Sequence, residues 1–348
     1  MVQIDAEFNA PTVPDEEAYE GTELDENVKN VLPKGSVVKW VATRGASFWA
    51  INSKVDTELP DGKLQSYFLK VYTAERAKEM AFGELEGSKA LFAALPANVP
   101  KPVAAGALAK DPSRHFYLAE FRDMADEMPG ATDFVSLVAK LHQTTESPNG
   151  KFGFHTKTYG GDNPLDTSWC DSWEQFFTRM MKQVMDRERA IHGPNEELDR
   201  LSPMIIDQVI PRLIRPMESE GRKIKPVLIH GDLWHGNVAV DNVTHEPVLY
   251  DPCAFYAHCE FEFAPWRAAR YRTTRDHVRA YYEIDAAQET EPSEDLDDRL
   301  ALYALRLDLM VSVSWPNNKR TRQLAVEEMK RLTEKYCSGT PDEGIEGV

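Results

Sequence analysis

Cysteine and long hydrophobic runs are both scarce in this chain of 348 residues. Four cysteines are too few for a disulfide scaffold, and they favour a reducing, cytoplasmic setting. The longest apolar runs, such as Leu309-Met310-Val311, are too short to span a membrane. The first seven residues lack the basic and apolar stretches of a secretory signal, and their acidity argues against a mitochondrial transit peptide. We therefore expect a globular protein of one or two domains.

Positive charge is also in short supply, because 40 basic residues face 57 acidic ones and the net charge is −17. Phosphate groups and anionic membranes are bound through Lys and Arg, so this balance argues against nucleic-acid and membrane partners. The excess of acidic residues is concentrated in two segments. Residues 1–28 hold nine acidic residues and no Lys or Arg, and residues 284–300 hold seven acidic residues and one basic residue, Arg299. We predict a flexible acidic arm over the first block, with partner docking as the less favoured role, and a surface loop between helices over the second.

The first third of the chain has the pattern of a small lobe rich in strands. Residues 65–72 and 115–121 are typical of strands, and Asp61-Gly62 before the first of them is a hairpin-turn signal. Helix-forming residues fill 74–95, until a group of prolines ends the pattern. We predict an N-terminal lobe over residues 29–119.

Beyond residue 131 the pattern becomes mainly helical, so we predict a larger C-terminal lobe over residues 120–348. Two short apolar strands, 226–230 and 247–250, interrupt the helices and each leads into polar residues. The fold class expected from this order is α+β. The helices expected in this lobe are 132–145, 172–191, 196–220, 262–283, 299–313 and 321–336.

The sharpest motif follows the first of these two strands. The strand ends in His230-Gly231-Asp232, Asn237 lies five positions after Asp232, and the second strand ends in Asp251. This order is typical of phosphotransferase catalytic loops, in which the first Asp accepts or orients the hydroxyl proton and the Asn and second Asp hold Mg²⁺. Hard oxygen ligands suit Mg²⁺, and divalent cations neutralise a triphosphate.

A buried polar turn is the alternative interpretation of this motif. A His-Gly-Asp triplet alone occurs by chance in turns. The spacing from Asp232 to Asn237, the flanking strands and the downstream Asp251 together favour the catalytic loop.

The upstream lobe contains candidates for the other half of a kinase site. Such a site needs a strand Lys on the phosphates and a helix Glu that pairs with it. Lys70 lies in the strand 65–72, where it would be costly unless paired, and Glu84 or Glu86 in the next helix could pair with it. We favour Glu84, and an exposed edge-strand Lys is the alternative for Lys70.

Two backbone segments are candidates for contacts with the nucleotide. The chain has no G-x-G-x-x-G, and only Gly45-Ala46-Ser47 stands where a phosphate loop would lie. Backbone amides there could bind phosphates, but a plain β-turn explains the segment nearly as well. The second segment is Glu120-Phe121-Arg122, where the strand 115–121 ends; its backbone groups would meet adenine.

Three stretches resemble the fructosamine/ketosamine kinase family, a relative of the aminoglycoside and choline kinases. Residues 230–239 are close to the family's HGDLWxGN, residues 250–262 (YDPCAFYAHCEFE) are close to YDPAxFYGHxEFE, and residues 151–156 read KFGFHT. His-Gly-Asp alone would fit any aminoglycoside-kinase relative, whereas Trp234 and the other two stretches narrow the resemblance to this family. It covers roughly residues 30–335.

The resemblance implies a bilobal protein-kinase-like fold and an ATP-dependent phosphorylation. In this family the acceptor is the sugar 3-hydroxyl of ketosamines, the ribulosamine or fructosamine adducts of lysine or proteins, and the unstable product leads to deglycation. On this mapping Asp232 is the base, Asn237 and Asp251 bind Mg²⁺, and Lys70 with Glu84 orients the phosphates of ATP.

The resemblance also implies substrate-side roles for three further residues. Trp234 would pack against the sugar, with a core position as the equal alternative. His258 and Glu260 would orient the sugar or brace the catalytic loop, and we favour bracing.

Some features depart from the family. Many relatives carry a Cys in the phosphate loop, whereas this loop reads Gly45-Ala46-Ser47, so redox control of the loop and dimerisation through it are not expected and a monomer is favoured. Cys253, His258 and Cys259 are one ligand short of a closed zinc site. The alternative functions are a small-molecule hydroxyl kinase of the aminoglycoside or choline type and a non-catalytic, pseudokinase-like binding protein.

Overall fold

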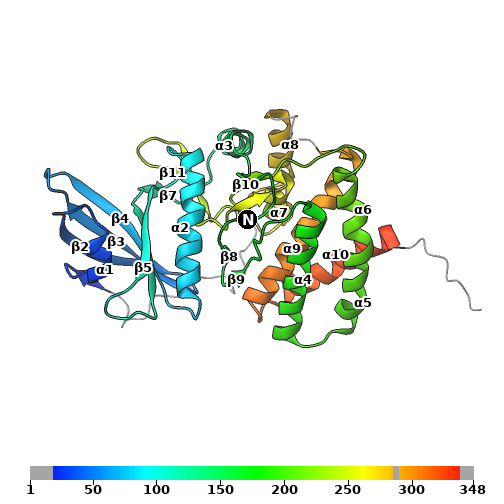
Figure 1. The fold of residues 1–348 in the computed structure, drawn as a ribbon, viewed down its shortest axis with the longest axis horizontal. Helices are drawn as coiled ribbons and strands as arrows, with labels where there is room; N and C mark the ends of the chain where they lie inside the picture. Colours follow the sequence, from blue (N-terminus) through cyan, green and yellow to red (C-terminus); the bar gives the residue numbers. More distant parts are fainter. Residues whose placement is uncertain (1–18, 285–289, 338–348) are drawn as a thin grey trace, which may run out of the picture. The chain divides into compact units, whose positions relative to one another are not determined.

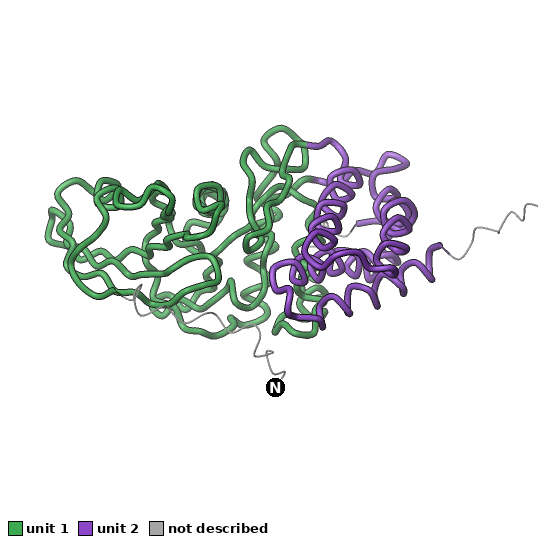
Figure 2. The backbone as a smooth tube through the Cα atoms, turned by 90° about the horizontal axis from the view of Figure 1, so that it is seen from below, with its two compact units in different colours: residues 1–169, 226–287 green, residues 170–225, 288–348 purple. Residues whose placement is uncertain are grey.

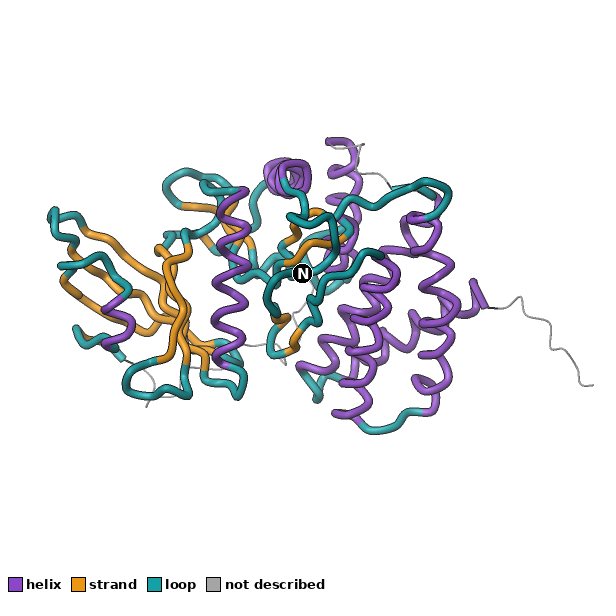
Figure 3. The backbone as a smooth tube through the Cα atoms, viewed as in Figure 1, coloured by secondary structure: helices purple, strands orange, loops and turns teal. Residues whose placement is uncertain are grey.

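The computed structural model describes residues 19–284 and 290–337 (Figure 1). The chain divides into two compact units (Figure 2). Unit 1 comprises Met1–Trp169 and Pro226–Ala287, and unit 2 comprises Cys170–Lys225 and Gln288–Val348. Strands gather in unit 1, whereas unit 2 is built from helices (Figure 3).

Unit 1 begins with an antiparallel sheet of six strands in the order β1-β2-β3-β4-β6-β5. Gly62 adopts a positive φ of 83° in the connection between β3 and β4, which is the hairpin predicted from Asp61-Gly62. The predicted strands over 65–72 and 115–121 are confirmed as β4 and β6. The strands are β1 (Glu20–Gly21), β2 (Val37–Ala46), β3 (Ala50–Glu58), β4 (Leu64–Tyr72), β5 (Pro102–Ala107) and β6 (His115–Glu120).

Side chains alternate across this sheet, so each face has its own core. Helix α2 (Ala77–Ala94), predicted over 74–95, covers the face that carries Tyr72 and Tyr117 and packs Met80 and Leu85 against it. Lys70 lies two residues before Tyr72 on the same strand and therefore shares this face. The pleat of β4 thus turns Lys70 toward α2.

The opposite face of the sheet is covered by a segment that we predicted to be a flexible arm. Asp25 caps helix α1 (Glu26–Asn30) by accepting from the Asn27 N–H, and its carboxylate also accepts from the amides of Ala109 and Lys110. Val28 on α1 is fully buried in that core. The arm prediction is therefore wrong for residues 19–28, because spaced apolar side chains anchor them to the sheet; residues 1–18 lie outside the described residues.

The remainder of unit 1, as far as the structure describes it, holds three small sheets, one of which is the pair β8 and β9, and three α-helices. The predicted strands over 226–230 and 247–250 are confirmed as β10 and β12, whereas β5, β11 and β13 were not predicted. Strand β10 pairs with β13, and β11 lies between β12 and β7. The elements are β7 (Met124–Ala125), α3 (Ala131–Thr144), β8 (Tyr159–Gly160), β9 (Asn163–Pro164), β10 (Val227–Ile229), β11 (Val238–Asp241), β12 (Pro247–Leu249), β13 (Phe255–Ala257), α7 (Ala264–Arg267) and α8 (Arg275–Ile284).

The single helix expected over 262–283 is wrong. The segment forms a 3₁₀ turn at Cys259–Phe263, the short helix α7 and, after a break, α8. Pro265 fits only in the first turn of a helix because it has no N–H, so α7 starts there instead of continuing from the 3₁₀ turn.

Unit 2 is a group of helices in which three match the predicted spans. The helix expected over 196–220 is broken: Pro211 cannot donate a backbone hydrogen bond, and the turn before it is π-helical, with the Ile210 N–H bonded to the Ile205 carbonyl. The elements are α4 (Trp173–His192), α5 (Glu196–Met204), the π turn η2 (Ile205–Val209), α6 (Ile210–Ile214), the 3₁₀ turn η3 (Arg215–Glu218), the 3₁₀ turn η6 (Ser293–Asp295), α9 (Leu296–Ser314) and α10 (Lys319–Cys337).

The acidic block over 284–300 is only partly the surface loop that we expected. Residues 285–289 lie outside the described residues, but Asp295 and Asp298 are buried. Asp295 pairs with Arg212 at 2.6 Å, and Asp298 lies on α9 and binds side chains of α10. These two acids therefore hold helices together. The prediction of a surface loop over 284–300 is wrong for Asp295 and Asp298.

Two wider observations concern membranes and thiols. Among the described helices, none has both the length and the apolar character to cross a membrane. No disulfide joins the four cysteines, all of which lie among the described residues.

Candidate active site

Lys70 lies at the centre of a buried ion cluster in unit 1. Its Nζ is 3.2 Å from Oε2 of Glu84 on α2 and 2.5 Å from Oδ1 of Asp251. The structure places Glu84, and not Glu86, beside Lys70; Glu86 instead pairs with Lys89 and His155. Lys70 and Glu84 are almost fully buried, while the Asp251 side chain is half exposed.

The charges in this cluster depend on one another. Burial alone would lower the pKa of Lys70, but the carboxylates of Asp251 and Glu84 outweigh it and raise that pKa well above its ordinary value. Burial raises the pKa of Glu84, although Lys70 counteracts the effect. The hydroxyl of Tyr72 donates to Glu84, and burial next to that carboxylate raises the pKa of Tyr72. Lys70 therefore carries a fixed positive charge.

The predicted catalytic loop folds around Asn237. Its Nδ2 donates to the carbonyl of Asp232 at 2.8 Å, to Oδ2 of Asp232 at 3.1 Å and to the carbonyl of Asp251 at 3.5 Å. The Asn237 carbonyl in turn accepts from the Tyr250 N–H at 3.1 Å, next to the pairing of β11 with β12. One amide side chain thus links the two aspartates predicted to take part in catalysis.

The backbone before Asp232 is left-handed at Gly231, a conformation that suits glycine. Gly231 adopts a positive φ of 81°, and a Cβ at this position would lie 2.2 Å from the carbonyl oxygen of Cys253. Nε2 of His230 donates to the Tyr250 carbonyl at 2.9 Å, and burial lowers the pKa of His230, so its ring is neutral at pH 7. Glycine is therefore required in the motif for both conformation and space.

The oxygen atoms around Asn237 and Asp251 fit a magnesium ion bound together with phosphates. The hydrogen bonds of Asn237 use its Nδ2 end, which leaves Oδ1 as the atom that could bind a metal ion, and Asp251 binds Lys70 through Oδ1 while its side chain stays half exposed. Two hard oxygen ligands are what Mg²⁺ takes from a protein when phosphates and water complete its shell. Across residues 19–284 and 290–337, no cluster of three His, Cys, Asp or Glu side chains could hold a metal by itself, the Cys253–Cys259 segment included.

The predicted phosphate loop is a tight turn between β2 and β3. The Ser47 N–H donates to the Ala50 carbonyl at 2.7 Å, and Oγ of Ser47 accepts from the amides of Trp49 and Ala50. Gly45 and Ala46 are the last residues of β2, and a Cβ at Gly45 would meet no atom within 4 Å. The side chain of Ser47 is therefore used to close the turn.

The predicted adenine-contacting segment lies at the end of β6. The Glu120 N–H donates to the Lys101 carbonyl, and the Phe121 N–H donates to the Ser66 carbonyl. The Arg122 side chain is held by Asp241 at 3.2 Å. The amides of Glu120 and Phe121 thus support the sheet, which leaves the carbonyls of this segment and the Arg122 amide as candidates for a base contact.

The three predicted substrate residues lie in different environments. Trp234 is half-buried, and its ring contacts those of His235 and Tyr271 at centroid distances of 4.9 and 5.4 Å. His258 and Glu260 are fully buried, with Nδ1 of His258 4.0 Å from Oε2 of Glu260. Only Trp234 has surface that a sugar could contact directly.

Two further residues belong to this site, although no role was predicted for either; Glu262 is the last residue of the stretch 250–262 that carries the family resemblance. Tyr72 hydrogen-bonds Glu84, and Glu262 binds the backbone amides of His230 and Gly231 at 2.6 and 2.9 Å. The signal for Glu262 was its place between Phe261 and Phe263 in an apolar stretch, because a carboxylate in such a stretch needs buried partners.

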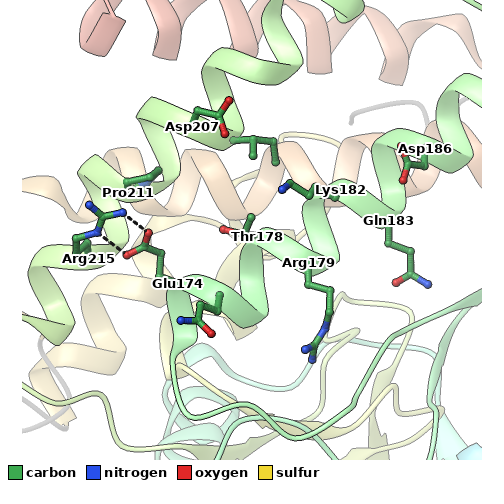
Figure 4. Close-up of a pocket in the computed structure, with 11 residues that line it drawn as sticks. Glu174, Thr178, Arg179, Lys182, Gln183, Asp186, Asp207, Pro211 and Arg215 are labelled. Carbon is green, nitrogen blue, oxygen red and sulfur yellow. Dashed lines mark hydrogen bonds and ion pairs between the residues drawn. The ribbon is translucent and has the colours of Figure 1, made fainter.

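Unit 2 carries an open hollow of about 730 Å³ between α4 and the helix that contains the π turn (Figure 4). Its walls have balanced charge, and the ion pair between Glu174 and Arg215 closes one end of it. None of the predicted site residues lines it. The lining residues are Glu174, Gln175, Thr178, Arg179, Lys182, Gln183, Asp186, Ile206, Asp207, Pro211 and Arg215.

Known proteins share both the sequence pattern and the fold. The family model for fructosamine kinase matches residues 50–325. A chloroplastic protein-ribulosamine 3-kinase of Oryza sativa subsp. indica is 28% identical over 239 residues, which are 67% of this chain and 64% of that protein, so the match spans less than two thirds of it. The ketosamine-3-kinase of Mus musculus is 30% identical over 220 residues, 57% of this chain and 68% of that enzyme.

Solved structures show the same architecture. A Thermobifida fusca protein with a proposed assignment as a fructosamine-3-kinase superposes with a TM-score of 0.68 at 23% identity, over 90% of this chain and all of that one. The aminoglycoside phosphotransferase APH(4)-Ia, in a ternary complex with AMP-PNP and hygromycin B, gives a TM-score of 0.57 at 14% identity, over 90% of this chain and 99% of that one.

The predicted α+β, protein-kinase-like fold is therefore confirmed, with an N-terminal antiparallel sheet followed by a mainly helical C-terminal region. The family model covers well over half of the chain and includes the Lys70 cluster and the loop around Asn237. The chain belongs to the fructosamine kinase family.

Proposed function

We propose that this chain is an ATP-dependent kinase that phosphorylates the 3-hydroxyl of the sugar in a ketosamine, with deglycation of the adduct as the outcome. The observation that carries the proposal is that the Lys70 ion cluster and the hydrogen bonds of Asn237 meet at Asp251 in unit 1. Lys70 binds Glu84 and Asp251, and Asn237 joins Asp251 to Asp232. Membership of the fructosamine kinase family supports the choice of acceptor.

Each group then has a role in phosphoryl transfer. The acceptor hydroxyl gives its proton to the carboxylate of Asp232 while its oxygen bonds to the γ-phosphorus, and the bond from phosphorus to the bridging oxygen breaks so that ADP leaves. Lys70, held by Glu84, neutralises and orients the phosphates. Asn237 and Asp251 would hold Mg²⁺, which when bound supplies further charge neutralisation for the triphosphate.

The segments described above would contact the nucleotide and the sugar. The turn at Gly45-Ala46-Ser47 would face the phosphates, and the backbone of Glu120-Phe121-Arg122 would face the base, so that residues 29–119 and 120–348 serve as the two functional lobes. The half-buried ring of Trp234 offers an apolar face for the sugar. His258 and Glu260 are fully buried, which favours the bracing role over direct contact. Four cysteines are too few for a disulfide scaffold, which supports a reducing compartment such as the cytoplasm.

The direct test is ADP release. With ATP, Mg²⁺ and ribulosyl-lysine or fructosyl-lysine, we expect ADP above the level of a control without sugar, and phosphate on the 3-hydroxyl by NMR. An aminoglycoside and choline, run beside the ketosamines, test the alternative acceptors. ADP release with one of those acceptors alone would replace the ketosamine assignment, and no ADP release with any acceptor would refute the proposed kinase activity.

The variant Asp232→Asn tests the assigned base and the pseudokinase alternative together. It keeps the shape of the side chain but removes the proton acceptor, so we expect kcat to fall by about 10²–10⁴-fold, the usual range for a lost general base. Binding of ADP and Mg²⁺ should stay within about twofold, because the contacts predicted for the nucleotide come from other residues. Turnover is measured by coupled ADP release and binding by isothermal titration calorimetry. Unchanged turnover would contradict the role of Asp232.

A further inference from the structure

The backbone directly before Asp232 is held by one buried carboxylate. Glu262 lies in the 3₁₀ turn Cys259–Phe263 with 1% of its surface exposed. Its Oε2 accepts from the His230 N–H at 2.6 Å, and its Oε1 accepts from the Gly231 N–H at 2.9 Å. Both carboxylate oxygens are therefore used on two successive amides of the catalytic loop.

This geometry depends on the left-handed conformation of Gly231. Successive N–H groups around such a residue point into one concave site that favours an anion, and the Glu262 carboxylate occupies it. From the other side, the His230 carbonyl accepts from the Cys253 N–H at 2.9 Å. The peptide between His230 and Gly231 is thus held by hydrogen bonds at both its carbonyl and its N–H.

The Glu262 carboxylate has one more polar neighbour. His142 on α3 is fully buried, with Nε2 3.7 Å from Oε2 of Glu262 and Nδ1 2.8 Å from the hydroxyl of Tyr281 on α8. If Tyr281 donates to Nδ1, a proton on Nε2 faces the carboxylate; the tautomer with its proton on Nδ1 would turn a lone pair toward the carboxylate. A buried carboxylate needs such compensation, and 3.7 Å is a charge–dipole contact, not a hydrogen bond.

We propose that Glu262 is a positioning residue for the catalytic loop and that His142 holds its carboxylate in the orientation that both amides require. The loop carries Asp232, which must meet the acceptor hydroxyl in line with the γ-phosphorus. A displacement of about 1 Å at such a site can cost about 10²-fold in rate. The kinetic part of this inference rests on the proposed function, whereas the structural part does not.

The first test replaces Glu262 with Gln, which has the same shape but only one acceptor oxygen. One of the two amides then faces an NH₂ group and loses its hydrogen bond. We expect faster hydrogen–deuterium exchange in the peptide that contains residues 230–232. We also expect kcat to fall by about 10²-fold, with the KM for ATP within about twofold. The variant Glu262→Asp keeps two oxygens on a shorter side chain and should recover part of both losses.

The control is Glu188→Gln in unit 2. Glu188 is also a buried carboxylate, and it is ion-paired with Arg322. The Glu188→Gln variant also replaces a buried carboxylate with an amide, and we expect it to lower the melting temperature. Hydrogen–deuterium exchange at residues 230–232 and kcat should nevertheless match the wild type. This control separates positioning of the loop from a general loss of stability.

The second variant, His142→Gln, leaves Glu262 intact and tests the inference if Glu262→Gln does not fold. We expect a smaller change in the same direction, about 10-fold in kcat, with faster exchange at residues 230–232. If residues 230–232 of Glu262→Gln exchange at the wild-type rate, the inference is overturned, whatever the turnover. If Glu262→Gln does not fold, the same result in His142→Gln overturns it. If the wild type phosphorylates no acceptor, the proposed function fails while the exchange measurement still decides this inference.

Discussion

Gly231 shows how one residue of the motif is dictated by the backbone. It combines a φ of 81° with a Cβ position 2.2 Å from the Cys253 carbonyl, whereas Gly62 has a φ of 83° and open space around the same position. A left-handed conformation costs an ordinary residue about 1–2 kcal/mol. The two glycines therefore differ in steric room and share the conformational cost.

We predict that Gly231→Ala lowers the free energy of unfolding by about 3 kcal/mol or more, because the strain of the left-handed region adds to a backbone clash. In the control Gly62→Ala, the free energy of unfolding should fall by only about 1–2 kcal/mol, because this variant has the conformational cost but no clash. Urea unfolding followed by circular dichroism measures both values. Equal losses would contradict the assigned clash.

At the scale of residues, the sequence predicts what lies close together along the chain. Asp232 and Asn237 are five positions apart, so their spacing was visible and the structure brings them together at 3.1 Å. Glu262 binds a backbone amide 32 positions away, and no local pattern encodes that distance. Contacts of this kind follow from the fold and not from a motif.

At the scale of elements, periodicity locates helices but not their interruptions. The spans predicted for α2, α3 and α4 agree with the structure to within a few residues. The helix predicted over 196–220 contains three prolines, and only the structure shows that Pro203 stays inside α5, whereas a π turn precedes Pro211 and a 3₁₀ turn contains Pro216. Strands β11 and β13 escaped prediction, whereas β10 and β12 are equally short but were predicted because each is an apolar run that leads into polar residues.

The junction of α9 and α10 depends on one carboxylate. Asp298 accepts hydrogen bonds from Arg331, Lys335 and Tyr336, all on α10. Burial alone would raise the pKa of Asp298, but these three donors outweigh it and lower that pKa to about 2, against an ordinary value of 3.8. The folded state therefore favours the ionised form.

We predict that Asp298→Asn destabilises the protein by about 1–2 kcal/mol at pH 7, a figure reduced from the full pKa shift because the Lys335 and Arg331 side chains are half exposed. Since the folded-state pKa is depressed, this contribution is complete above about pH 4 and is lost as the pH falls through about 2. The difference in unfolding free energy between variant and wild type should shrink over that range. Asp297→Asn, at the exposed neighbouring position, is the control, and a difference that does not change with pH would contradict the assignment.

At the scale of the whole molecule, the charge of −17 says little about the active site. Most of the excess comes from residues 1–28 and 284–300, and within the second block Asp295 and Asp298 are paired inside unit 2. The Lys70 cluster and the loop around Asn237 both lie in unit 1. Every residue that we assign to the nucleotide therefore belongs to one compact unit.

This location predicts where a nucleotide protects the chain. With ADP and Mg²⁺, hydrogen–deuterium exchange should slow in the unit 1 segments 45–49, 68–72, 118–122, 230–237 and 249–252, because each carries a proposed contact. It should stay unchanged in 174–186 and 206–215, which line the hollow in unit 2. ADP with EDTA is the control: if Asn237 and Asp251 hold the metal, protection at 230–237 and 249–252 depends on Mg²⁺, whereas protection at 118–122 persists because it comes from the base. Protection centred on the unit 2 hollow would place the nucleotide in that hollow. This result would contradict the assignment of the site to the Lys70 cluster, because the charge of Lys70 orients only phosphates that bind next to it.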